Sequence, residues 1–124
     1  MAREILSQVP GKPYCRGTRS GNMVFISGQL GLDRNDKVVP GGVGPQMRQC
    51  MEYIKEILAE AGAVLDDVVM VNVYLDNLAG DYDEMNKVYR EYFGQENLPA
   101  RATVEVSRLA MDLPVEVSCI AMLG

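Results

Sequence analysis

The chain contains no histidine among its 124 residues. This absence excludes nucleophilic triads with a histidine base, zinc sites of the HExxH type and any imidazole acid–base pair. Chemistry in this protein must therefore rely on arginine, lysine, carboxylates, tyrosine, cysteine, hydroxyls, backbone groups or bound water.

Cysteine is scarce, with three residues at positions 15, 50 and 119. An odd number of cysteines, far apart and without a CxxC pair, indicates neither a disulfide framework nor a thiolate metal cluster. We therefore predict that the cysteines are small buried hydrophobic residues, and we expect no metal and no cofactor.

Long apolar runs and an excess of basic charge are also missing. No segment approaches the ~20 apolar residues of a membrane span, and the stretch MAREILSQV lacks the apolar core of a signal peptide. The net charge of −5 and a pI near 4.7 argue against a surface built to bind phosphate backbones. We expect a cytoplasmic protein that binds neither membranes nor nucleic acid.

The residues that are present have the composition of an ordinary globular protein. Of the 124 residues, 48% are hydrophobic and 23% are charged, which suits a single domain over residues 1–124 with a core of its own. There is no internal repeat, and the Gly/Pro-rich segment VVPGGVGP at 38–45 is too short for a linker.

Two hydrophobic stripes with helical period predict two helices. The first lies between residues 45 and 62, with proline at its start and glycine just past its end; its stripe is Met47, Met51, Ile54 and Leu58. The second lies within residues 81–93, with acidic residues near its start, where the helix dipole favours anions; its stripe is Tyr82, Met85, Val88, Tyr89 and Tyr92.

Segments rich in β-branched residues predict strands, so that the order of elements is β-β-α-β-α-β-β. Residues 14–20 and 22–27 should form a hairpin. Residues 101–107 and 113–123 close the chain as two strands. In the segment 67–77, alternation would place Val69, Val71, Val73 and Leu75 on one face. Because both faces of this segment are apolar and the helices cover only one, we expect another subunit to cover the other.

The stretch LPARATVEVS, residues 98–107, places Arg101 at the start of a strand, on one face with Thr103. If this strand pairs antiparallel with the last one, Glu116 comes close to Arg101. Such a pair is most often a salt bridge. An arginine in a pocket without an obligatory partner is instead a carboxylate receptor, because its planar fork matches a carboxylate, and a nearby glutamate could then hold a water.

Several motifs carry a resemblance to a known family. The stretch PARATVEVSRL, followed by VEV at 115–117, resembles the signature of the RidA (YjgF) family of enamine/imine deaminases. Similar segments cover nearly the whole chain; they include PYCRG at 13–17, NMVFISGQLGLD at 22–33, DVVMVNVYLDNLAGDYDEMN at 67–86 and YREYF at 89–93.

This resemblance implies a chorismate-mutase-like α+β fold, with a mixed β-sheet and two helices packed on one face, assembled as a homotrimer with a central β-barrel and active sites between subunits. It also implies an enzyme of metabolite damage control that hydrolyses 2-enamino and 2-imino acids, such as 2-aminoacrylate, to 2-oxo acids and ammonia, as a 2-iminobutanoate/2-iminopropanoate deaminase does. Arg101 would bind the substrate carboxylate, and Glu116 would position the hydrolytic water.

Four further residues would line the pocket by the same resemblance, namely Tyr14, Ser27, Asn86 and Thr103. Each also has a structural explanation, respectively as a hairpin aromatic residue, a turn hydroxyl, a surface residue of a helix and a sheet former. At Thr103 the chain departs from the family, where cysteine is frequent, so the substrate preference could differ.

Two alternatives stay open. The substrate could be another carboxylate-bearing enamine, such as 2-aminomuconate. The protein could also be a non-enzymatic binding or chaperone-like relative, or one that cleaves RNA. The acidic charge and the absence of histidine weigh against RNA cleavage, although a trimer could bring Arg16, Arg19 and Arg48 together.

Overall fold

The computed structural model describes residues 3–124. In chain order its elements are β1 (Glu4–Gln8), β2 (Cys15–Ser20), β3 (Met23–Leu30), α1 (Val43–Glu60), β4 (Val68–Leu75), α2 (Leu78–Phe93), β5 (Ala100–Glu105) and β6 (Val115–Met122). Short 3₁₀ turns lie at Leu65–Asp67 and Ala110–Asp112. The predicted order is confirmed from β2 onward. Strand β1 was missed, because its sequence EILSQ has only two apolar residues and no alternation to reveal it.

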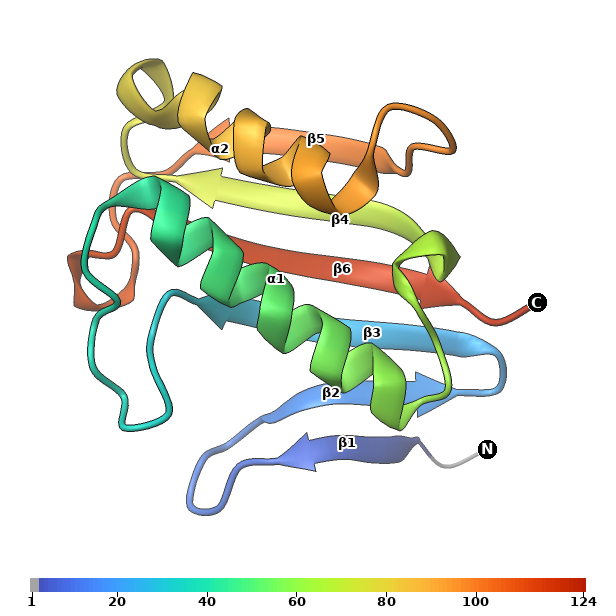
Figure 1. Ribbon diagram of the computed structural model, residues 1–124. Coiled ribbons are helices and arrows are strands. Elements are labelled where there is room, and N and C mark those ends of the chain that lie inside the picture. Colours follow the sequence, from blue (N-terminus) through green and yellow to red (C-terminus); the bar gives the residue numbers. More distant parts are fainter. Residues whose placement is uncertain (1–2) are drawn as a thin grey trace.

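The strands form one six-stranded sheet in the order β1-β2-β3-β6-β4-β5. All neighbouring strands are antiparallel except β4 and β5, which are parallel. Both helices lie on the same face of this sheet (Figure 1). The predicted α+β fold, with a mixed sheet and two helices on one face, is therefore confirmed.

The strand arrangement corrects one prediction about the site. Strands β5 and β6 do not pair, because β4 lies between them. The chain leaves β4, passes through α2 and returns as β5, and such a crossover makes the two strands parallel. Arg101 is in register with Val71, which is buried against the helices. Glu116 is in register with Tyr74, which directly follows the helix-facing Val73, and so points to the other face.

The core lies between the sheet and the helices. The predicted stripe of α1 is confirmed, since all four of its residues are at most 1% exposed. In α2 the stripe is right at Met85, Val88 and Tyr89, whereas Tyr82 remains 40% exposed. Of the cysteines predicted to be buried, Cys50 and Cys119 are buried and Cys15 is half-buried.

A β-bulge at the start of β4 overturns part of the predicted alternation. The register with β6 shifts between Val68 and Met70. Val68 is therefore buried, whereas Val69, expected on the face of Val71, is 45% exposed. The extra residue of a bulge reverses the facing of the side chains that precede it.

The face of the sheet away from the helices carries apolar side chains in contact with water. Strands β1, β3, β5 and β6 all contribute to it, and four of these side chains are between 39% and 51% exposed: Ile5, Phe25, Val104 and Met122. We call this surface the open face. No helix within residues 3–124 is long and apolar enough to cross a membrane.

Candidate functional site

A cavity of about 430 Å³ lies between α2 and the start of β5. We call it the Arg101 pocket. Tyr82, Asn86 and Tyr89 of α2 line it together with Arg101. These helical residues are spaced by four and three positions, so they share one face of α2. Helix α2 passes over β4 and the edge strand β5 (Figure 1), and two of these residues contact Arg101 of β5.

Arg101 has only neutral partners in this pocket. Its Nη1 donates a hydrogen bond to Oδ1 of Asn86 at 2.7 Å, and its Nη2 a longer one to the Tyr82 hydroxyl at 3.4 Å. Its Cζ lies 4.6 Å from the ring centroid of Tyr89. Within residues 3–124 no carboxylate lies within 4.0 Å of this guanidinium. Asn86 and the Tyr89 ring thus orient a cation that no carboxylate among residues 3–124 pairs with.

Two buried hydroxyl groups near Arg101 lack partners. The Oγ1 of Thr103, which shares the helix-facing side of β5 with Arg101, and the hydroxyl of Tyr89 make no hydrogen bond within the described part of the chain. Burial raises the pKa of Tyr89, against the opposing influence of Arg101. A buried polar group without a partner costs roughly 1–3 kcal/mol. Residues 3–124 therefore leave two buried hydroxyl groups without hydrogen bonds near Arg101, which has no carboxylate partner in the same range.

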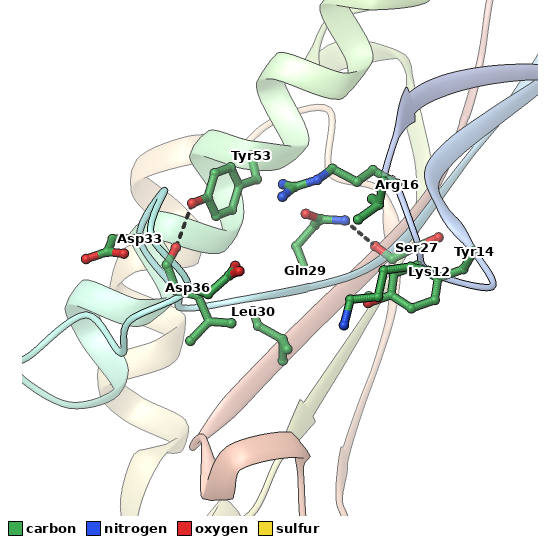
Figure 2. Close-up of a pocket in the computed structure, with 12 residues that line it drawn as sticks. Lys12, Tyr14, Arg16, Ser27, Gln29, Leu30, Asp33, Asp36 and Tyr53 are labelled. Atoms are coloured by element: carbon green, nitrogen blue, oxygen red, sulfur yellow. Dashed lines mark hydrogen bonds between the residues drawn. The ribbon is translucent and has the colours of Figure 1, made fainter.

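A second cavity, of about 140 Å³, lies where β2 and β3 meet α1. We call it the Ser27 pocket, and Figure 2 shows its wall. Ser27 donates its hydroxyl hydrogen to the carbonyl oxygen of Cys15 at 2.8 Å. Tyr14 also lines the pocket and is 58% exposed. Both predicted residues are thus at one cavity, but that cavity is separate from the Arg101 pocket.

Glu116 lies against the wall of the Ser27 pocket. In β6 it faces Leu30 of β3, next to a register shift between Ile26 and Gln29. Gly28, which lines the pocket, lies so close that a Cβ there would be 2.4 Å from Oε2 of Glu116. A glycine is therefore required for the carboxylate to occupy this place. Burial raises the pKa of the Glu116 carboxyl.

The structure thus brings the predicted residues together as two groups. Asn86 and Thr103 accompany Arg101, whereas Tyr14 and Ser27 accompany Glu116, and the groups do not meet within one chain. Sequence reasoning missed two features. It assigned Tyr82 and Tyr89 only to the packing stripe of α2, although their spacing from Asn86 places them on the face that holds Arg101. It also gave Gly28 no role. Among residues 3–124, no cluster of three or more His, Cys, Asp or Glu side chains could hold a metal ion.

Comparison with known proteins agrees with the fold and with the motifs. Residues 6–123 match the family model described as Endoribonuclease L-PSP. The chain belongs to this family, which is the RidA (YjgF) family that its motifs resemble.

Several relatives match over most of their length. A RutC family protein of Pyrococcus abyssi is 44% identical over 126 residues, covering 98% of each chain. The 3-aminoacrylate deaminase RutC of Acinetobacter baylyi is 41% identical over 126 residues, again with 98% of each covered. The 2-iminobutanoate/2-iminopropanoate deaminase of Escherichia coli is 36% identical over 112 residues, covering 89% of this chain and 87% of the other.

A solved structure confirms the likeness of fold. The crystal structure of E. coli TdcF with bound serine superposes with a TM-score of 0.87 at 31% identity, covering 98% of this chain and 99% of that one.

Proposed function

We propose that this protein hydrolyses 2-imino acids and their 2-enamino tautomers, such as 2-aminoacrylate, to 2-oxo acids and ammonia. The observation that carries the proposal is Arg101, a half-buried guanidinium held by Asn86 and Tyr89 that has no carboxylate partner in the described chain. Its planar fork suits a substrate carboxylate. The names of two relatives, both deaminases of carboxylate-bearing imines or enamines, agree with this role.

The reaction needs a fixed substrate, an oriented water and a proton acceptor. Arg101 fixes the carboxylate of the substrate and so places C2, the imine carbon. Glu116 accepts a proton from the water as the water oxygen bonds to C2, while the π electrons of the C=N bond move to nitrogen, and Glu116 passes this proton to that nitrogen. Glu116 then carries the proton of the carbinolamine hydroxyl to the amino nitrogen, the C=O bond forms as the C–N bond breaks, and ammonia leaves. One water is consumed for each ammonia released, and positioning supplies much of the acceleration.

The raised pKa of Glu116 suits this work. Burial disfavours its charged form, so its carboxylate is a stronger base, and a better acceptor of a proton from water, than the carboxylate of an exposed glutamate.

The catalytic residues require two subunits. Arg101 and Glu116 point to opposite faces of the sheet, so they cannot act on one substrate molecule within one chain. We place each active site in a cleft of a homotrimer, where one subunit contributes Arg101, Asn86 and Thr103 and its neighbour contributes Tyr14, Ser27 and Glu116. The apolar open face supports this assembly, because three copies packed around a central barrel would remove it from water.

A second candidate substrate is 3-aminoacrylate. The relative from A. baylyi that is named for this substrate is more similar to the chain than the E. coli iminobutanoate deaminase, at 41% against 36% identity. This compound is also an enamine that carries a carboxylate, so the same roles of Arg101 and Glu116 apply to it.

An ammonia-release assay tests the function. The substrates are 2-iminopropanoate and 2-iminobutanoate, generated in place by a dehydratase from serine and threonine, together with 3-aminoacrylate and 2-aminomuconate. We expect the protein to accelerate ammonia release from at least one of them and Arg101→Ala to abolish the acceleration. Rates equal to those without protein for all four would refute the proposal.

Incubation with RNA tests the alternative that the family description names. Wild-type protein and Arg101→Ala are compared under the same conditions. Cleavage that persists unchanged in Arg101→Ala, together with no ammonia release, would replace the deaminase proposal with a nuclease.

A further inference from the structure

Arg16 is a second arginine that projects into a cavity and has no anionic partner within the part of the chain that the structure describes. It lines the Ser27 pocket, and its Cζ lies 5.1 Å from the ring centroid of Tyr53 (Figure 2). The Tyr53 ring is fixed in turn, because its hydroxyl donates to the carbonyl oxygen of Leu32 at 2.6 Å. Neither an ion pair nor a side-chain hydrogen bond engages Arg16 within residues 3–124. The cation is therefore held in place while its N–H donors remain available.

The side of the Ser27 pocket that carries Arg16 is positively charged. Lys12 also lines the pocket and has no carboxylate partner in the described chain. Asp33 and Asp36 lie on the opposite side (Figure 2). Oδ1 of Asp33 accepts backbone N–H groups of the following turn at 2.8 and 3.0 Å, and Asp36 is exposed, so that solvent screens its charge.

The cationic side lies close to the reacting groups. Ser27 and Gly28 line the same cavity, and Gly28 touches the side chain of Glu116. The cavity of about 140 Å³ is well above the roughly 10–15 Å³ that one water needs. It therefore has room for a carboxylate at the end of a short chain whose other end is near Glu116.

We propose that Arg16, assisted by Lys12, forms a second anion subsite, and that the preferred substrates are 2-imino acids whose side chain ends in a second carboxylate. This inference rests on the proposed function and narrows its substrate class. Arg101 binds the carboxylate next to the imine carbon, as above, and the guanidinium of Arg16 binds the distal one. The relatives' names assign no such subsite.

A matched pair of substrates isolates the distal carboxylate. An amino acid oxidase converts glutamate to 2-iminoglutarate and norvaline to 2-iminopentanoate, which has a methyl group where the other has its second carboxylate. For the wild-type protein we expect a higher kcat/KM with 2-iminoglutarate. In Arg16→Gln the ratio of the two kcat/KM values should fall at least about tenfold, the effect of losing one charge-assisted hydrogen bond. Arg16→Lys, which keeps the charge, should retain part of the preference.

Arg34→Gln is the control for a merely structural role of Arg16. The Cζ of Arg34 lies 5.0 Å from the centroid of the same Tyr53 ring, but Arg34 is paired with Glu56 and does not line the pocket. This variant should leave the ratio unchanged. An equal change of the ratio in Arg34→Gln and Arg16→Gln would overturn the subsite, because it would trace the effect to the placement of Tyr53.

A binding measurement separates this inference from the proposed function. Calorimetry compares 2-oxoglutarate with 2-oxopentanoate, the stable products of the two reactions, on wild-type protein and Arg16→Gln. Tighter binding of 2-oxoglutarate that is lost in Arg16→Gln supports the subsite, even if neither imino acid is hydrolysed and the proposed function fails. Hydrolysis of both imino acids with a ratio that Arg16→Gln does not alter would overturn the subsite and leave the proposed function standing.

Discussion

Replacing Arg101 with lysine tests the carboxylate receptor directly. The guanidinium donates to Asn86 at 2.7 Å and stacks on the ring of Tyr89. Lysine keeps the positive charge, but its compact ammonium cannot present two parallel N–H groups to one carboxylate. We therefore expect Arg101→Lys to fold and assemble as the wild type does, and to bind the transition state more weakly.

The expected loss follows from the number of bonds at stake. A hydrogen bond to a charged group contributes about 1.5–3 kcal/mol, and each ~1.4 kcal/mol is a factor of ten in rate. The loss of one bond of the fork therefore predicts a decrease in kcat/KM of about 10- to 150-fold. The stability change should be small, because no carboxylate of the described chain within 4.0 Å loses its partner. The cation–π contact with Tyr89 contributes on the order of 1 kcal/mol, or a few degrees in Tm.

The assay compares Arg101→Lys with Arg108→Lys. Arg108 is exposed and lies after β5, where its Nε pairs with Oδ1 of Asp112 at 2.5 Å. The control should keep wild-type kcat/KM for ammonia release from 2-iminobutanoate. Full activity of Arg101→Lys would refute the receptor. A large fall in its Tm, with activity per folded molecule unchanged, would return Arg101 to a structural role.

Three further predictions concern the other half of the site and the assembly. Glu116→Gln should lower kcat more than it raises KM. It should also leave Tm at neutral pH equal or higher: because burial raises the folded-state pKa of Glu116, its ionised form costs stability above that pKa. In the wild type, kcat should fall as the pH drops through this raised pKa, and a pH profile together with melting curves checks all three outcomes. Gly28→Ala should reduce kcat at least about tenfold while circular dichroism stays native, since its Cβ would lie 2.4 Å from Oε2 of Glu116 and displace the carboxylate; wild-type kcat would contradict the placement of Glu116. Light scattering should give three times the chain mass of 13.7 kDa, and a stable monomer at micromolar concentration would exclude the trimer.

Local features of the fold could be read from the sequence, because they depend on neighbours along the chain. The stripe from Met47 to Leu58 repeats with the period of a helix, and the observed helix α1 buries it. The turn at 20–22 joins β2 and β3 as predicted. Arg101 and Thr103 share a face because strand residues two apart do so. The motifs around Arg101 and Glu116 also indicated the family that the comparison confirms.

Only the tertiary structure decided how the two halves of the site are arranged. Which strand pairs with which is a long-range choice that no local pattern encodes, so the insertion of β4 between β5 and β6 was not foreseen. The register of each strand pair then decides to which face of the sheet a side chain points. The pairing of β5 with β4 puts Arg101 beside Val71, and the pairing of β6 with β4 puts Glu116 beside Tyr74, so the two residues point to opposite faces. The bulges in β3 and β4 each add one residue, so the side chains that precede a bulge point to the opposite face from the one that regular alternation predicts. The sequence pattern does not show where these bulges occur. Residue types therefore determined the chemistry available to this protein, whereas the strand order determined that Arg101 and Glu116 lie on opposite faces of the sheet in a single chain.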